Sequence, residues 1–238
     1  MKIAVGLSGG VDSSVAAALL RQDGHEVIGI TMKLWQNGRY RGGAKDACFG
    51  PGEVDDIARA AELCRQLDIP YRVFDCADEY ERVVLDYFRS EYLAGNTPNP
   101  CVRCNALMKF GVLPHLARQS GLAFDRFATG HYARVREAAG RFRLLRGMDT
   151  AKDQSYFLYR LNQEQLAGLM FPLGELHKCE VRLLAGRLGL AVQDQPDSQD
   201  FYSGEHAELL NTPDREGNIV DAAGQILGNH RGFWHYTI

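Results

Sequence analysis

Two patterns of apolar residues alternate along the first third of the chain. Short apolar runs at residues 3–7, 27–30 and 71–74 predict buried strands, and apolar residues three or four positions apart between them predict amphipathic helices. The first helix is expected to have Asp12 and Ser13 as N-cap residues and to end at Gly24. Strands separated by helices form parallel sheets through right-handed crossovers.

The same alternation continues to a strand that ends at residue 129, after which the pattern changes. Residues 132–145 alternate around Ala139-Gly140 and predict a β-hairpin, and helices are expected near 163–169 and 178–188. Short strand and turn signals follow residue 194. We therefore expect an α/β fold, a doubly wound parallel sheet, with a domain boundary between 194 and 204.

Composition narrows the class of protein. The chain has 238 residues, 45% of them hydrophobic and 24% charged, which suits a soluble globular protein. It shows no signal peptide and no apolar run long enough to span a bilayer, so we expect a cytoplasmic protein without a membrane partner. The net charge of −3 gives no global sign of nucleic-acid binding. Six cysteines are too few for a disulfide scaffold, so paired cysteines indicate metal or redox chemistry.

A glycine-rich loop after the first strand is the sharpest local feature. Small residues let the backbone turn tightly, so several N–H groups can face one anion at the start of the next helix. The alternative is a simple turn. The loop matches neither the Walker A pattern nor G-x-G-x-x-G. Its residues are Gly6, Leu7, Ser8, Gly9, Gly10, Val11, Asp12, Ser13 and Ser14.

A C-x-x-C pair follows a proline-rich loop in the stretch TPNPCVRCN, residues 97–105. Cys104 lies where a helix is expected to begin, beside Arg103, so its pKa should be lowered and its thiol largely ionised near neutral pH. The pair alone is compatible with a redox couple, half of a zinc site, part of an iron–sulfur site or two ordinary cysteines.

These motifs carry a family resemblance. The loop resembles the SGGxDS PP-loop of the N-type ATP pyrophosphatases, and TPNPCVRCN resembles a segment of the bacterial tRNA 2-thiouridylases. Further stretches resemble that family in the same order: ATGHY at 128–132, KDQSYFL at 152–158, FPLGEL at 171–176 and DSQ at 197–199. The similarity covers nearly the whole chain.

The resemblance implies an ATP-dependent sulfurtransferase. ATP would adenylate O2 of the wobble uridine in a tRNA anticodon loop, and a protein-bound persulfide would deliver sulfur to C2 as AMP leaves. Cys104 matches the nucleophile, and Asp12 is expected to act through Mg²⁺. The implied ATP contacts are the loop residues with Met32 and Gly130. The implied tRNA contacts are Asn99, Pro100, Cys101, Lys152, Asp153 and Gln154.

One position departs from the family. Relatives continue DSQ-x-x-C-F with a second catalytic cysteine, and here Tyr202 stands in its place. Three alternatives are open. Cys101 resolves or carries the persulfide for Cys104; or these two bind a [4Fe–4S] cluster with Cys179 or Cys48; or the protein is impaired. The sulfur would come from a donor protein or from inorganic sulfide.

The predicted hairpin carries a local excess of arginine that could engage tRNA phosphates. On a hairpin, Arg134 and Arg136 share a face, as do Arg141 and Arg143, although such residues also occur on any solvated hairpin.

Two other functions remain open: a different PP-loop ligase or amidotransferase, and a tRNA-binding relative without catalysis. We expect a catalytic domain over 1–204 and, over 205–238, the start of a central tRNA-binding domain. Compared with the family, the C-terminal β-barrel is expected to be absent, as in a piece of a longer protein.

Overall fold

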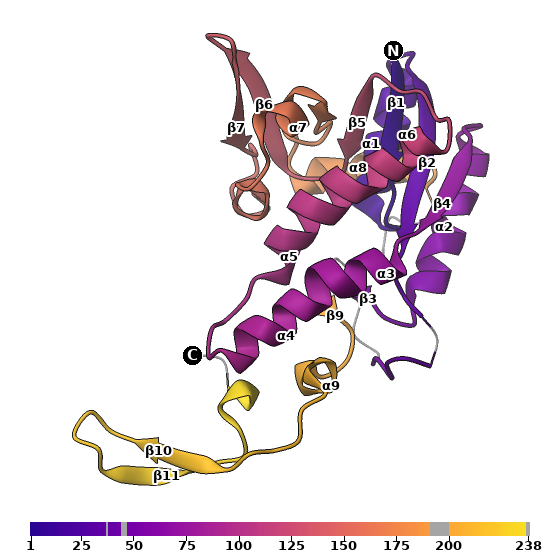
Figure 1. Cartoon of the computed structure of the whole chain (residues 1–238). Coiled ribbons are helices and arrows are strands. Elements are labelled where there is room, and N and C mark those ends of the chain that lie inside the picture. The colour runs from indigo at the N-terminus through magenta and orange to yellow at the C-terminus, as the bar shows by residue number, and fades with distance from the viewer. Residues whose placement is uncertain (37, 44–46, 191–199, 237–238) are drawn as a thin grey trace.

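The computed structural model describes residues 1–36, 38–43, 47–190 and 200–236. Its centre is a five-stranded sheet of order β4-β2-β1-β5-β8, in which every pair of neighbours is parallel. The strands are β1 (Lys2–Gly6), β2 (Glu26–Lys33), β4 (Tyr71–Asp75), β5 (Arg126–Thr129) and β8 (Leu169–Met170). The predicted α/β fold with a parallel sheet is confirmed (Figure 1).

Helices cover both faces of this sheet. Alternate residues of β1 point to opposite sides, and Ile3 and Val5 pack in one core cluster with helices α1, α2 and α8, whereas Ala4 packs in another with η2 and α6. The main helices are α1 (Val11–Gln22), α2 (Glu53–Gln66), η2 (Cys104–Val112), α6 (Leu113–Gln119) and α8 (Lys178–Arg187). The shorter ones are α3 (Ala77–Tyr80), η1 (Glu81–Leu85), α4 (Asp86–Leu93), α5 (Pro100–Arg103), η3 (Ser155–Leu158), α7 (Gln163–Ala167), α9 (His206–Leu210) and η4 (Phe233–His235).

The helical segment of α5, η2 and α6 runs without a break, and its middle part is a π-helix (Figure 1). Such widened turns often mark functional sites. Here the widened part begins at Cys104, so the C-x-x-C pair spans the change in helical winding.

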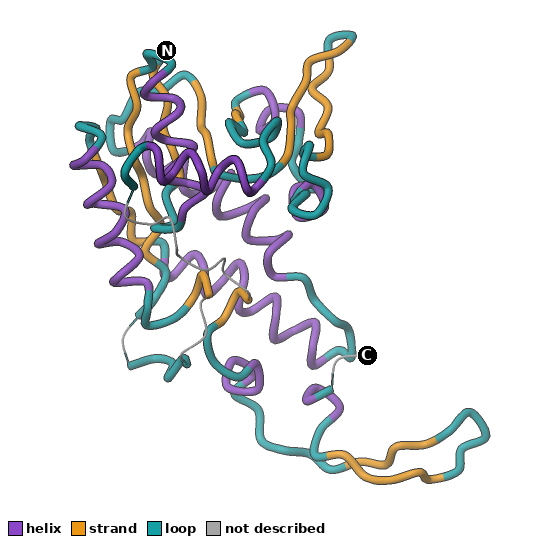
Figure 2. Tube along the Cα trace, turned by 180° about the vertical axis from the view of Figure 1, so that it is seen from behind, coloured by secondary structure: helices purple, strands orange, loops and turns teal. Residues whose placement is uncertain are grey.

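Three two-stranded sheets accompany the central one. The antiparallel pair β6 (Ala133–Ala138) and β7 (Arg141–Arg146) confirms the predicted hairpin. A second antiparallel pair, β10 (Gly217–Val220) and β11 (Ile226–His230), projects away from the rest of the molecule (Figures 1 and 2). The third pair is parallel and joins β3 (Ala47–Phe49) to β9 (Asp200–Tyr202), two segments far apart in the sequence.

Residues beyond β9 pack onto the first part of the chain. Leu209, Leu210 and Trp234 are buried in the same aromatic cluster as Phe49 and Tyr80. The predicted boundary between 194 and 204 lies partly outside the described residues, and the division at residue 204 stays a prediction. None of the helices in the described ranges has both the length and the apolarity needed to cross a membrane.

The order of the strands explains where a ligand can bind. The chain adds β2 and β4 on one side of β1, and later adds β5 and β8 on the other side. In open parallel sheets of this kind, a crevice forms beyond the carboxyl ends of the strands where the direction reverses. In this protein that place lies beyond Gly6 of β1 and Thr129 of β5, which are paired neighbours.

Candidate active site

The glycine-rich loop lies at this reversal point, between β1 and α1. Gly9 has a φ of +75°, and a Cβ atom there would meet the backbone oxygen of Asp56 at 2.5 Å. Only glycine therefore fits this position without displacing α2. The loop is held against the sheet by the Thr31 hydroxyl, which donates to the Leu7 carbonyl at 2.9 Å.

The start of α1 differs from the sequence-based expectation. The N-cap residue is Gly10, in an extended conformation and without a side-chain cap, so the prediction that Asp12 and Ser13 cap this helix is wrong. The hydroxyls of Ser13 and Ser14 instead donate to the Gly10 carbonyl at 3.2 and 2.9 Å. Ser13 Oγ also accepts from the Ser8 backbone N–H at 3.2 Å. These bonds tie the loop to the first turn of the helix, where an anion is favoured.

Asp12 takes part in a set of contacts that the sequence did not reveal. Lys178 Nζ lies 2.8 Å from both carboxylate oxygens of Asp12, and the Tyr132 hydroxyl donates to Oδ1 at 2.8 Å. Only 11% of the Lys178 side chain is exposed. Lys178 opens α8, which packs against α1, so helix packing brings it across 166 positions of sequence. In the sequence, the only indication of a role for Lys178 was its position two residues after the FPLGEL motif.

Gly130, directly after β5, lies against the backbone of the glycine-rich loop. A Cβ atom at this position would lie 2.6 Å from the carbonyl carbon of Asp12 and from the nitrogen of Ser13. The following residue, His131, is buried, and its Nδ1 is 2.7 Å from the Thr129 hydroxyl. Burial lowers the pKa of His131 well below its usual value, so the ring is neutral.

Met32 lies near the carboxyl end of β2, where the resemblance implies an adenine contact. Its side chain is partly buried and packs against two of the core clusters. The adenine contact stays a prediction.

The C-x-x-C pair lies at the start of the continuous helical segment formed by α5, η2 and α6. The Asn99 side chain accepts from the Val102 N–H at 3.1 Å as the N-cap of α5, and Pro100 occupies the first turn. Cys101 and Cys104 are both partly buried against the aromatic cluster that contains Phe49 and Tyr80.

The predicted ionisation of Cys104 is wrong. Burial, the largest effect, raises the pKa of Cys104 to about 12 and that of Cys101 to about 11. Arg103 gives no compensation, because its guanidinium stacks on the Tyr87 ring at 4.5 Å and its Nε donates to the Val83 carbonyl. Lys109 is the positive charge that acts on both thiols, and it is too weak to offset their desolvation.

The four candidate thiols are not equally placed. Cys48 lies on β3, is exposed, and is close enough for its charge to raise the pKa of both Cys101 and Cys104. Cys179 is exposed on α8, and its charge figures in neither effect. Within the described ranges, no three His, Cys, Asp or Glu side chains are arranged to hold a metal ion.

Tyr202 is a structural residue. It is fully buried, its hydroxyl donates to Glu208, and it accepts from the Gly42 N–H at 3.2 Å. Through β9 it pairs with Phe49 of β3, the neighbour of Cys48. The DSQ motif at 197–199 lies outside the described residues. Tyr202 thus holds the strand that carries Cys48 in place, and the expected difference from the family at this position stays a prediction.

The four predicted arginines of the β6–β7 hairpin all lie on one face, whereas the sequence predicted only two separate pairs that each share a face. Residues paired across an antiparallel ladder point to the same face, and Arg136 is paired with Arg143, Arg134 with Leu145 and Arg141 with Ala138. All four predicted arginines therefore share one face. The opposite face carries Val135, Phe142 and Leu144, which pack on the core. On the arginine face, Arg134 is already engaged: its Nε donates to the Arg146 carbonyl and its guanidinium pairs with Glu175 at 3.2 Å.

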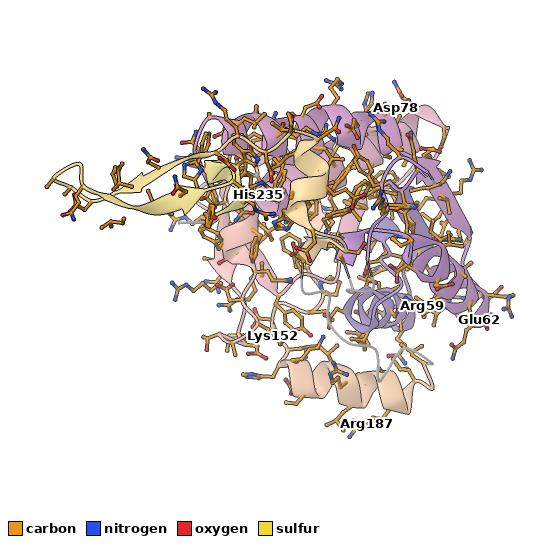
Figure 3. The ribbon with its side chains drawn as sticks, turned by 90° about the horizontal axis from the view of Figure 1, so that it is seen from below. Arg59, Glu62, Asp78, Lys152, Arg187 and His235 are labelled. Carbon is orange, nitrogen blue, oxygen red and sulfur yellow. The ribbon has the colours of Figure 1, made fainter. Side chains whose placement is uncertain are left out.

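Of residues 152–154, the first is exposed to solvent and the other two hold the loop through hydrogen bonds. Lys152 is exposed, and in Figure 3 it lies on the side of the molecule that carries α8, away from Asp78. Asp153 accepts from the Gly147 and Ser155 N–H groups, and Gln154 accepts from the Tyr132 N–H at 3.0 Å. Asp153 and Gln154 thus shape the loop, and their predicted contact with tRNA stays a prediction.

Fold and site together define a class: a PP-loop α/β domain, with a glycine loop at the reversal point of a parallel sheet. A protein-family model described as "tRNA methyl transferase HUP domain" matches residues 1–202. The tRNA-specific 2-thiouridylase MnmA of Endomicrobium trichonymphae is 50% identical over 242 residues, covering 100% of this chain and 67% of the relative. That of Geotalea uraniireducens (strain Rf4) is 47% identical over 248 residues, covering 100% of this chain and 65% of the relative.

The chain therefore belongs to the tRNA-specific 2-thiouridylase family, and it spans about two thirds of the length of these curated relatives. Among solved structures, a 4-thiouridine synthetase–RNA complex with bound ATP has a TM-score of 0.50 at 16% identity, covering 85% of this chain and 44% of that one. This likeness supports the fold.

Proposed function

We propose that this chain catalyses ATP-dependent 2-thiolation of the wobble uridine of tRNA, releasing AMP and pyrophosphate. One observation carries the proposal: the helix that begins at Cys104 packs against the strand end that touches the glycine loop. Phe110 of η2 lies 5.6 Å, between ring centroids, from His131, which follows the Gly130 that abuts Asp12 and Ser13. Thiol chemistry and phosphate chemistry are therefore neighbours.

The loop is suited to hold the pyrophosphate part of ATP. Backbone N–H groups, the first turn of α1 and Lys178 supply positive potential. Asp12 is the expected Mg²⁺ ligand, and the fit is supported by its two oxygens already facing a cation, Lys178 Nζ. Mg²⁺ would there offset the phosphate charge. Without ATP, the ammonium group of Lys178 neutralises the Asp12 carboxylate. When ATP and Mg²⁺ bind, we expect this ammonium group to pair with a phosphate oxygen instead.

Activation and sulfur transfer follow in order. The uridine O2 attacks the α-phosphorus of ATP, and pyrophosphate leaves. A Cys104 persulfide then attacks C2 with its outer sulfur, and AMP leaves with the former O2. The Cys101 thiolate attacks the Cys104 sulfur, which releases the 2-thio product and a Cys101–Cys104 disulfide. An external dithiol then reduces this disulfide and a persulfide donor protein transfers its outer sulfur to the Cys104 thiolate. Alternatively, sulfide attacks the Cys104 sulfur of the disulfide, which forms the Cys104 persulfide and releases the Cys101 thiolate without another reductant.

Cys48 suits the entry of sulfur better than Cys179. It is exposed, whereas Cys101 and Cys104 are partly buried, and it is their electrostatic neighbour. A persulfide on Cys48 can pass its outer sulfur to the Cys104 thiolate and regenerate the Cys48 thiolate, so no oxidant is needed.

A [4Fe–4S] cluster is the other sulfur path. It needs three ligands, and among the residues in the described part of the chain no such group is arranged for a metal. We therefore derive no step through a cluster. Iron and sulfide analysis of anaerobically purified protein tests it, and stoichiometric iron lost together with activity in Cys48→Ser would favour the cluster.

The other candidate functions are less well supported. An amide-forming PP-loop ligase has no use for a thiol pair beside the loop, and a non-catalytic tRNA binder has no use for the paired Asp12 and Lys178. Methyl transfer, which the family model's description names, requires no ATP loop of this kind.

The decisive experiment is a 2-thiouridine assay with ATP, Mg²⁺, tRNA and a low-molecular-weight persulfide with a dithiol, run in parallel with sulfide and no dithiol. Cys104→Ser should abolish 2-thiouridine and leave ATP binding intact, whereas Cys179→Ser, the matched exposed thiol, should act like the parent. Asp12→Ala should suppress release of pyrophosphate. Retained thiolation in Cys104→Ser would remove this residue from its role, and unchanged pyrophosphate release in Asp12→Ala would contradict the assignment of the loop.

A further inference from the structure

Two tyrosine rings stand exposed beside the thiol helix, and the proposed mechanism does not use them. Tyr156 is 64% exposed and Tyr159 is 63% exposed, and their ring centroids are 6.0 Å apart with planes tilted by 44°. Large aromatic rings in adjacent exposed positions are uncommon on a surface that only meets water, and they often mark a binding site.

The backbone below these rings is held firmly. Asp153 accepts from the N–H and the hydroxyl of Ser155 at 3.1 and 2.9 Å, which fixes the start of η3. The Asn105 side chain donates to the Phe157 carbonyl at 3.3 Å, and Leu158 is buried. The two rings are therefore presented by an anchored segment, which lowers the entropy lost when a ligand binds to them.

The surroundings suit a polyanion with unpaired bases. Element η3 contacts α5, which carries Cys101, and it also contacts β7 of the arginine hairpin. Arg160, next to Tyr159, is exposed, and the exposed fraction of the Arg146 side chain is 82%. Leu158 of η3 packs on the apolar face of the hairpin, which also carries Arg146, and the four other arginines are on the opposite face. The aromatic rings are thus accompanied by Arg146 and Arg160 on one side and by the helix of the thiol pair on the other.

We propose that Tyr156 and Tyr159 form a stacking platform for unpaired bases of an RNA loop, next to the thiol pair. The proposal rests on the proposed function and adds a surface to it. Flat bases stack on exposed aromatic rings whatever their sequence, while arginines bind the phosphates between them. Stacking on this platform would hold the neighbours of the target uridine while that uridine enters the site.

The test compares two RNA probes with the whole 238-residue chain. One is an anticodon stem-loop, and the other is a blunt duplex of the same stem without unpaired bases. Anisotropy gives the Kd for the parent, Tyr156→Leu, Tyr159→Leu and Tyr156→Phe. Val73→Ala is the control, because Val73 is also an exposed apolar residue, at 40%, and lies on the edge strand β4, away from the assigned sites.

Each leucine variant should weaken stem-loop binding about tenfold and leave duplex binding unchanged. Tyr156→Phe should bind like the parent, because stacking needs the ring and not the hydroxyl, and Val73→Ala should also bind like the parent. The salt dependence of binding should fall in Arg136→Gln and Arg143→Gln, which remove phosphate contacts, and not in the tyrosine variants.

Three results would overturn the platform. They are stem-loop binding that is unchanged in both leucine variants, equal losses for stem-loop and duplex, and normal RNA binding with a loss only of sulfur transfer from a donor protein. The last would assign the rings to a protein partner. Parallel 2-thiouridine assays keep the two proposals separate: thiolation that does not depend on the rings sinks only the platform, and ring-dependent binding without thiolation sinks only the proposed function.

Discussion

The glycine loop and the thiol pair belong to one proposed reaction, yet they are prepared in opposite ways. The loop is charged and paired: Asp12 is held by Lys178 and Tyr132, and the serines are bonded to Gly10. The thiols are uncharged and desolvated, with pKa values of about 11 and 12. The phosphate site is ready before its ligand arrives, whereas the thiols need a change in their surroundings before they react.

The largest expected effect concerns the thiols. With the pKa of Cys104 raised to about 12 from 9.0, its thiolate fraction near neutral pH falls about 1000-fold. Alkylation of Cys104 and Cys101 by iodoacetamide should therefore be far slower than that of the exposed Cys179, and should rise about tenfold per pH unit up to pH about 10. Peptide mass spectrometry after timed labelling measures the rates.

The same shift affects stability. Because the folded protein keeps these thiol protons to higher pH than the unfolded chain does, their contribution to the free energy of unfolding is complete below about pH 8.5 and is lost as the pH rises through 11 and 12. In the labelling experiment, equal rates for Cys104 and Cys179 at neutral pH would show that burial does not suppress ionisation of Cys104, and would contradict the contrast between the thiol pair and the charged loop.

The next effect concerns the charge balance of the loop. Lys178→Met should lower the rate of pyrophosphate release about 100-fold, because it removes the cation on Asp12 and a charge for the leaving phosphate. Lys178→Arg should recover part of the rate. The control is Lys33→Met, since Lys33 pairs with Asp75 at 3.1 Å on the surface. If both methionine variants release pyrophosphate at the parent's rate, the contact of Lys178 with Asp12 is only structural.

A smaller effect is expected where β5 touches the loop. Gly130→Ala places a methyl group 2.6 Å from backbone atoms of Asp12 and Ser13, so the loop must shift at a cost of about 1–3 kcal/mol. ATP should bind more weakly while the thiol labelling rates stay unchanged. Gly228→Ala is the control, because a Cβ atom there meets nothing within 4 Å. Denaturant unfolding and ATP titration measure the two quantities, and unaltered ATP affinity would separate Gly130 from the loop.

The smallest effect concerns Tyr202, which is buried beside the Cys48 strand. Tyr202→Phe removes the hydroxyl that donates to Glu208 and accepts from Gly42, and should cost about 1–2 kcal/mol of unfolding free energy. Thiolation by the folded variant should be unaffected, because the phenol has no part in sulfur transfer. A loss of activity without a loss of stability would give Tyr202 a chemical role.

The sequence predicted some elements of the fold and site correctly and others wrongly. Apolar periodicity located the strands of the parallel sheet and the hairpin, because burial on one or both faces imposes those periods locally. The glycine loop and the C-x-x-C pair were also visible, since each motif is a short stretch of backbone. The predicted N-cap residues of α1 were wrong: the N-cap is Gly10, and the hydroxyls of Ser13 and Ser14 donate to the Gly10 carbonyl.

The sequence by itself thus determined the fold class, the family and the reactive motifs, all of which are properties of local segments. The tertiary structure alone decided how those segments act on one another. Helix packing placed Lys178 on Asp12, and strand register put four arginines on one face. Phe49, the neighbour of Cys48, is buried in the same aromatic cluster against which Cys101 and Cys104 pack. Burial then reversed the ionisation expected for Cys104, because desolvation depends on what surrounds a group and not on its neighbours in the chain.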